Sequence, residues 1–166
     1  MVVLYTGNQP QTADLYRKAL EGEKLVLVDD QALDMTIEQL AALDHDLISG
    51  QPGSLTPFIF VTGNDQADAQ RILSSMAEKF NPLPDMAMET ADNKPWTFKA
   101  LLEEIEKEKA YFAMREELYD LIRNMSRERV NNDPAYAQTI MEGYMLLKAP
   151  QAEPEDVERI LNALKA

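Results

Sequence analysis

The chain has 166 residues, which suits one domain, or one domain with a small appendage, built around a hydrophobic core. Its 16 Lys and Arg against 29 Asp and Glu give a net charge of −13, which disfavours binding to nucleic-acid phosphates. The absence of cysteine excludes disulfides, thiolate metal sites and cysteine nucleophiles, and a single histidine excludes His-rich zinc sites. We therefore predict no cofactor and no metal.

The first residues and the overall hydropathy indicate where the protein works. No stretch approaches the roughly 20 apolar residues of a membrane span. The run Met1-Val2-Val3-Leu4-Tyr5 has no charged region before it, as an export signal would. We expect a cytoplasmic protein that makes no membrane contact.

Two similar units occupy the first half of the chain. In each, a short apolar run precedes a Thr-Gly-Asn turn, and apolar residues near the 3.6 period of a helix follow. This pattern is typical of a strand, a turn and a helix. A second strand is expected after each helix, which gives two β–α–β halves. The four runs are Val2–Tyr5, Leu25–Val28, Phe58–Val61 and residues 86–88.

Between the halves, residues 34–43 predict a short helix. Thr36 is its expected N-cap, and Gln39, three residues later, is the expected capping-box partner. The fold class predicted from these elements is α/β, with a four-stranded, mainly parallel sheet of strand order 2-1-3-4. The same elements also permit a ferredoxin-like α+β sandwich. If the first and third strands ran antiparallel, the two Thr-Gly-Asn turns would lie at opposite ends of the sheet.

From Trp96 onward the pattern is helical. A charged run at 106–109 interrupts the apolar positions, as expected where a helix leaves one core. Asp133 and Pro134 are placed as the N-cap and first residue of another helix, and Pro154 opens the last one. We predict an α/β domain at 1–111 and a helical extension at 112–166. The extension is too small for a convincing core of its own and needs a surface to pack against.

Around Trp96 the sequence has a Thr-x-x-Asn segment, a Trp and a Leu-Leu-Glu-Glu helix start, with Thr90, Asn93, Trp96, Leu102 and Glu104 at the characteristic places. This arrangement resembles an uncharacterised bacterial domain-of-unknown-function family, in which a strand ends in Thr-x-x-Asn and a Trp and a Leu-Leu-Glu-Glu-type helix follow. The resemblance covers roughly residues 1–112 and implies a small α/β domain with no assigned activity.

A more distant resemblance is to response-regulator receiver domains. It rests on residues 60–62, which are similar to a fourth strand ending in Thr, and on Lys94-Pro95. The acidic cluster after the first strand and the phospho-acceptor Asp of receivers have no counterpart, so phosphotransfer is not implied.

Polar residues follow the predicted strands and form the candidate ligand site. In a parallel sheet they lie at the carboxyl ends of the strands, where α/β sheets bind ligands. The alternative is that Thr-Gly-Asn serves only as turn and capping chemistry. No nucleotide-binding motif accompanies them. The candidates are Thr6, Asn8, Thr62, Asn64, Asn93, Lys94 and Trp96.

Each of the other candidates has a simpler structural interpretation. Asp29 and Asp30, with Asp34 nearby, have the oxygen ligands that Mg²⁺ prefers, but adjacent acids usually form a solvated turn. His45 lies between two acids without a nucleophile motif and is expected at the surface. Trp96 is expected to pack as a staple onto the sheet, with Asn93 capping the turn. No catalytic residue is predicted.

Residues 111–145 carry an apolar stripe with several methionines. Most of it is expected to form the core of a helical hairpin, although such a surface also suits an adaptable partner. Residues 96–130 are nearly neutral, with 7 Lys and Arg against 8 Asp and Glu, so a partner meets little repulsion there. We therefore predict a non-enzymatic binding or regulatory module that contacts a protein partner or a second copy through the extension. The alternative is a small-molecule or anion-binding enzyme with its site at the strand ends.

Overall fold

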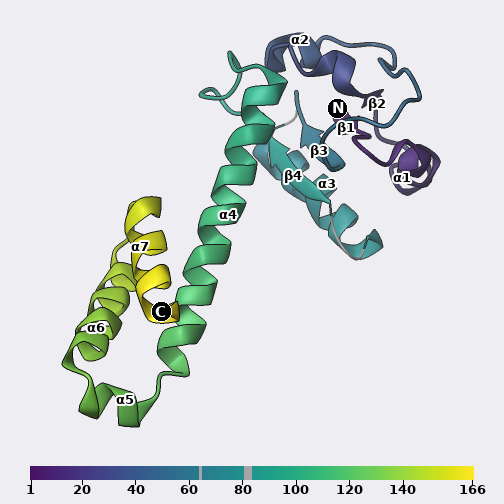
Figure 1. Cartoon of the computed structure of the whole chain (residues 1–166). Helices are drawn as coiled ribbons and strands as arrows, with labels where there is room; N and C mark the ends of the chain where they lie inside the picture. The colour runs from purple at the N-terminus through teal and green to yellow at the C-terminus, as the bar shows by residue number, and fades with distance from the viewer. Residues whose placement is uncertain (64, 81–83) are drawn as a thin grey trace. The chain divides into compact units, whose positions relative to one another are not determined.

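The computed structural model describes residues 1–63, 65–80 and 84–166. The chain forms two compact units, Met1–Leu102 and Glu103–Ala166, which we call the sheet unit and the helical unit. Helix α4 (Phe98–Arg123) begins in the first and ends in the second (Figure 1). The predicted division at 111/112 falls in the same helix, and residues 106–109 are exposed on it.

The sheet has the predicted strand order, β2-β1-β3-β4. Two of its three neighbouring pairs are parallel, β1 with β2 and β3 with β4, which confirms the mainly parallel prediction. The central pair is antiparallel: Val2 of β1 lies opposite Val61 of β3, and Tyr5 lies opposite Phe58. The sheet is therefore mixed, with two parallel β–α–β halves joined antiparallel. Its strands are β1 (Val2–Tyr5), β2 (Leu25–Val28), β3 (Phe58–Val61) and β4 (Asp85–Met88).

The central strands β1 and β3 are buried along their whole length, which explains their uninterrupted apolar sequences. Alternate residues such as Val2 and Leu4 join a core with helices α1 (Ala13–Ala19) and α3 (Gln66–Lys79). The residues between them, which point to the opposite face of the sheet, contact Phe98. Its ring centroid lies 5.8 Å from that of Tyr5, 6.2 Å from Phe58 and 6.4 Å from Phe60, each time edge-on. Short 3-10 helices η1 (Pro10–Thr12) and η2 (Asp30–Ala32) follow β1 and β2.

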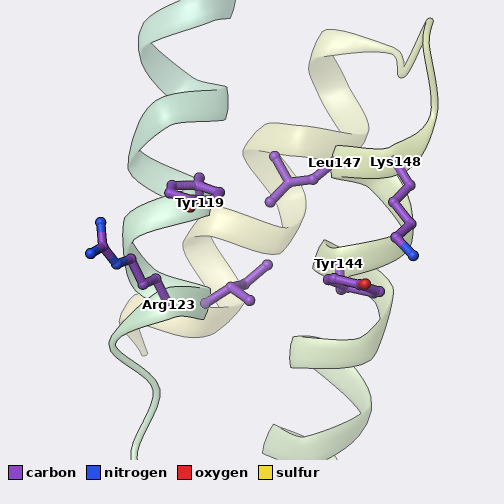
Figure 2. Close-up of a pocket in the computed structure, with 6 residues that line it drawn as sticks. Tyr119, Arg123, Tyr144, Leu147 and Lys148 are labelled. Atoms are coloured by element: carbon purple, nitrogen blue, oxygen red, sulfur yellow. The ribbon is translucent and has the colours of Figure 1, made fainter.

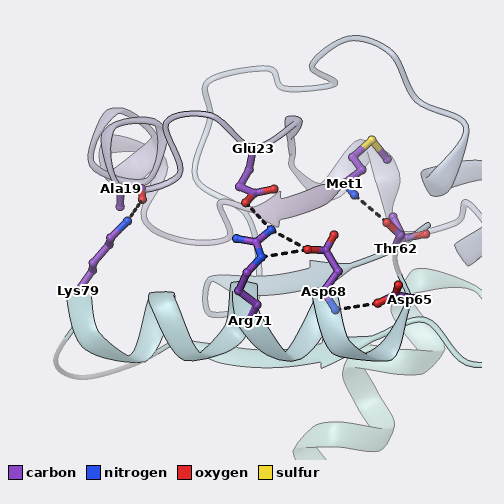
Figure 3. Close-up of polar contacts among 8 residues, drawn as sticks. All are labelled: Met1, Ala19, Glu23, Thr62, Asp65, Asp68, Arg71 and Lys79. Carbon is purple, nitrogen blue, oxygen red and sulfur yellow. Dashed lines mark hydrogen bonds and ion pairs between the residues drawn. The ribbon is translucent and has the colours of Figure 1, made fainter.

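Polar contacts hold α3 against the turn that precedes β2 (Figure 3). The Arg71 guanidinium reaches Glu23 at 2.9 Å and Asp68 at 2.7 Å. Lys79 donates to the Ala19 carbonyl at 2.6 Å, at the end of α1. The two β–α–β halves are thus joined by side chains as well as by the central strand pair.

Helix α2 (Ile37–Ala41) has the capping box predicted from Thr36 and Gln39. The Gln39 N–H donates to the Thr36 hydroxyl at 3.2 Å, and the Thr36 N–H donates to the Gln39 side-chain oxygen at 2.8 Å. The neighbouring backbone is tied to the start of α4, because the Phe98 N–H donates to the Met35 carbonyl at 2.8 Å.

The helical unit has its own core, which the second half of α4 completes. The amphipathic spacing of α7 contributes four of the six buried residues, which are Leu118, Ile140, Val157, Ile160, Leu161 and Leu164. The surface that the extension was expected to need is thus α4. The remaining helices are α5 (Arg127–Asn132), α6 (Pro134–Lys148) and α7 (Pro154–Lys165), and Asp133 caps α6 as predicted.

Arg115 of α4 holds the end of α6. Its guanidinium donates to the Leu147 carbonyl at 2.8 Å and to the Ala149 carbonyl at 3.4 Å. Tyr111, one turn earlier, donates to the Ala152 carbonyl at 2.7 Å. The Leu147 and Ala149 carbonyls lie at the C-terminal end of α6, which is the negative end of its helix dipole, so the Arg115 cation stabilises them. Among the described residues, no helix is long and apolar enough to cross a membrane.

Candidate functional site

The single ligand-binding edge expected at the strand ends is not formed. Because β1 and β3 run antiparallel, the carboxyl ends of β1 and β2 lie at one edge of the sheet and those of β3 and β4 at the other. Thr6 and Asn8 are therefore separated from Thr62, Asn93 and Lys94. Asn64 lies outside the described residues.

At the first edge, the loop at 49–55 folds over the end of β1. The Asn8 N–H donates to the Leu55 carbonyl at 2.8 Å, and the Gly53 N–H donates to the Gly7 carbonyl at 2.7 Å. Thr6 is buried, with its N–H bonded to the Val28 carbonyl at 2.9 Å, whereas Asn8 is exposed. Gly7 has φ of +52°, and a Cβ there would overlap the Leu55 carbonyl oxygen, so only glycine fits this turn.

The two acids at this edge are occupied by donors from the same loop. Asp29 is 3% exposed and accepts the Ser49 N–H, the Ser49 hydroxyl at 2.6 Å and the Gln31 N–H at 3.0 Å. Burial alone would raise the pKa of Asp29, but these hydrogen bonds outweigh it and hold the pKa below its usual value. The carboxylate is therefore a structural anchor for the loop.

Asp30 anchors the loop in the same way. It accepts the Tyr5 hydroxyl and the Ser54 N–H, the latter at 3.1 Å. Burial, together with the hydrogen bond to Asp30, raises the pKa of Tyr5 to about 12.

No group of three or more acidic or histidine side chains among the described residues has the arrangement of a metal site.

At the opposite edge, Glu89 brings the residues after β3 and β4 together. It accepts the Thr62 hydroxyl and the Gly63 N–H at 3.1 Å, and it pairs with the Lys94 ammonium at 3.5 Å. Burial would raise the pKa of Glu89, but Thr62, Gly63 and Lys94 together lower it. Sequence reasoning missed Glu89. The sequence did contain a signal, because Glu89 comes one residue after β4. Val61 and Met88 are register partners, so the residues that follow them, Thr62 and Glu89, are brought together.

A shallow cleft of about 290 Å³ lies beside this cluster, lined by Gly63, Glu89, Thr90, Ala91 and Lys94. Since Glu89 already compensates the charge of Lys94, the cleft offers an anion no uncompensated cation. Ligand binding by the predicted residues at either edge stays a prediction.

The Thr-x-x-Asn segment forms a closed turn. The Thr90 N–H donates to the Asn93 side-chain oxygen at 2.9 Å, and the Asn93 N–H donates to the Thr90 hydroxyl at 3.2 Å. The Asn93 side-chain amide also donates to the Met88 carbonyl at 3.0 Å, at the end of β4. Trp96 is 40% exposed, so the staple expected of it is instead made by Phe98, which is fully buried.

His45 is exposed, as expected. Its Nδ1 lies 2.6 Å from the Asp44 carboxylate, and 72% of its side-chain surface is open to solvent.

The helical unit has a contrasting surface, because many of its large apolar side chains are exposed. Of the nine exposed large apolar side chains among the described residues, six belong to this unit of 64 residues. The predicted apolar stripe therefore divides: Leu118 is buried in the core, whereas Phe112, at 64% exposure, is not. The six are Phe112, Tyr119, Met125, Met141, Tyr144 and Met145.

Two hollows flank α6 on this surface. One, which we call the α4–α6 groove, has a volume of about 400 Å³. In Figure 2, Leu147 of α6 points toward α4, whereas Arg123 of α4 and Lys148 of α6 lie on the outer sides of the two helices. Tyr119 on α4 and Tyr144 on α6 also line the groove. Its lining is completed by Ile122. The Lys148 ammonium lies 4.4 Å from the centroid of the Tyr144 ring.

The second hollow, of about 620 Å³, lies between α6 and α7 beside Met141 and Met145. Its one cation is Arg159, which reaches Glu142 at 3.4 Å and Asp156 at 3.5 Å. The charges of this hollow are thus satisfied within the unit, so the α4–α6 groove is the stronger candidate site.

Residues 57–112 match a family model described as Domain of unknown function (DUF3783). The match confirms the resemblance to a domain-of-unknown-function family, and it includes Thr90, Asn93 and Trp96. It does not support the receiver resemblance. No curated protein and no solved structure matches the chain. The matched segment ends before the residues of the α4–α6 groove.

Proposed function

We propose that this protein is a non-enzymatic binding or regulatory module that contacts a protein partner through its helical unit. The observation that carries the proposal is the concentration of exposed Tyr, Phe and Met side chains on α4 and α6. Protein interfaces are enriched in these residue types, and methionine adapts its shape to a partner. Large apolar patches on a folded surface commonly mark interaction sites.

An enzyme at the strand ends has less support. The carboxylates of Asp29, Asp30 and Glu89 are each engaged by donors of the sheet unit, which leaves them as structural acceptors. His45 contacts Asp44 and is not accompanied by a nucleophile motif. A general acid or base needs a reactive group beside it, and these side chains supply loop anchors instead.

The test compares the exposed apolar residues of the two units. The variant Tyr119→Ser/Tyr144→Ser changes the helical unit, and the control Leu15→Ser/Ile48→Ser changes two exposed apolar residues of the sheet unit. Each protein is used for quantitative co-purification from cells of the source organism and for light scattering after size exclusion.

We expect wild type and control to retain the same protein partner, or to form the same dimer, and the helical variant to lose it. Thermal unfolding should be similar for all three, because all four side chains are exposed. If the helical variant retained everything that wild type retains, the proposal would be wrong.

A further inference from the structure

The positively charged side chains of the helical unit differ in whether they have an anionic partner. The unit has nine Lys and Arg against fourteen Asp and Glu. Five of the nine form ion pairs and Arg115 binds carbonyls, whereas Arg123, Arg127 and Lys148 have no anionic partner among the described residues. The paired cations are Lys107, Lys109, Arg129, Arg159 and Lys165.

Two of these three cations, Arg123 and Lys148, line the α4–α6 groove. Arg123 lies on the outer side of α4 and Lys148 on the outer side of α6, so the two cations flank the groove (Figure 2). The remaining lining residues are Tyr119, Ile122, Tyr144 and Leu147, and no carboxylate is among them. An acidic unit therefore has an apolar groove bordered by two uncompensated positive charges.

The spacing of the lining residues matches helix packing. On α4 they are 119, 122 and 123, and on α6 they are 144, 147 and 148, so each helix contributes an i, i+3, i+4 ridge. Two such ridges form a groove into which a third helix can place its own i, i+3, i+4 side chains.

We propose that the α4–α6 groove binds an amphipathic helix of a partner protein, with acidic residues flanking its apolar stripe. The apolar stripe packs on Tyr119, Tyr144 and Leu147, and the flanking carboxylates pair with Arg123 and Lys148. This rests on the proposed function and specifies the partner.

A second copy of the chain fits the groove less well. In a two-fold symmetric contact the same patch meets itself. The cations of one groove, Arg123 and Lys148, would then meet a second groove whose lining has the same two cations and no carboxylate. An acidic helix supplies the complementary charge that a copy of this groove does not.

The proposal is tested with displayed helical peptides and the full chain. A library of 18-residue peptides carries Leu, Met or Phe at i, i+3, i+4 and i+7, and Glu, Gln or Lys at the flanking positions. Sorting against wild type should enrich Glu over Lys about tenfold, as two exposed ion pairs would give. Arg123→Glu/Lys148→Glu should reverse the preference to Lys.

The matched control is Arg127→Glu, which changes the third unpartnered cation, outside the groove lining. It should keep the preference for Glu. Circular dichroism melts establish that all variants are folded.

Each other outcome overturns the inference in a distinct way. Enrichment without a charge preference would leave the proposed function standing and refute the acidic partner. No enrichment would refute the groove as a helix site, while the co-purification experiment decides the proposed function separately. A wild-type dimer that Tyr119→Ser abolishes would assign the groove to a second copy.

Discussion

Phe98 should be one of the most important side chains for the stability of the sheet unit. It is fully buried at the start of α4 and contacts the rings of Tyr5, Phe58 and Phe60 edge-on. Phe98→Ala removes these contacts and leaves a cavity, and buried Phe→Ala changes cost about 3–5 kcal/mol. With a urea slope of about 1–3 kcal/mol per M, the unfolding midpoint should fall by about 1–5 M.

The chain provides both a probe and a control for this change. Trp96 is the one tryptophan and lies two residues from Phe98, so its fluorescence reports the unfolding of the sheet unit in urea. Phe112→Ala makes the identical chemical change on the same helix, but at a side chain that is 64% exposed. Its effect should stay within about 0.5 kcal/mol.

Phe98→Leu should lower the midpoint less than Phe98→Ala, because Leu keeps much of the apolar volume but loses the ring edges. This milder variant keeps the measurement possible if the alanine variant does not fold. Equal midpoints for Phe98→Leu, Phe112→Ala and wild type would refute the role given to Phe98.

Three further predictions concern the loops and the helical unit. Gly7→Ala should destabilise the protein more than Gly63→Ala in urea titrations. Both glycines have positive φ, but only at Gly7 would an added Cβ overlap a carbonyl oxygen. Equal effects of the two substitutions would contradict this. The lowered pKa of Asp29 means that its contribution to stability is present above the unfolded pKa of about 3.9 and is lost as pH falls through the folded value. Asp29→Asn should therefore flatten the loss of thermal stability in acid, whereas the exposed Asp92→Asn should not. Arg115→Ala should lower the unfolding free energy, measured by circular dichroism, by about 1–3 kcal/mol, because the carbonyls at the end of α6 lose their donor. Arg127→Ala is the control, and an equal loss of stability in that variant would contradict the role given to Arg115.

Local features of the fold were predictable because neighbouring residues determine them. The capping box of Thr36 and Gln39 and the Asp133 cap of α6 each depend on residues three apart, and both are confirmed. The strand order was also predicted correctly. The chain direction of β3 against β1 was left open, because strands buried on both faces have uninterrupted apolar sequences in either direction.

The candidate site was less predictable because it depends on contacts between distant segments. The sequence indicated an apolar stripe on α4 but not which members reach the core, so Phe112 and Leu118 could not be distinguished. The staple was assigned to Trp96 because it lies at the start of the predicted helix. However, Phe98 is the first residue of α4, and its position on the apolar face of that helix with Leu101 and Leu102 turns it inward.

The segment that matches the family model ends before the residues of the α4–α6 groove begin, so the match and the proposed function concern different parts of the chain. Within residues 57–112 the distinctive side chains serve the fold: Thr90 and Asn93 close a turn, and Phe98 fills the sheet face. The groove residues Tyr119 to Lys148 all follow the match. A protein that shares only the matched segment would therefore share the architecture of β3, β4 and the start of α4, but it would lack both walls of the groove. We accordingly expect partner choice to be a property of the helical unit, and grafting Arg123 and Lys148 onto such a protein should not transfer the preference for acidic helices.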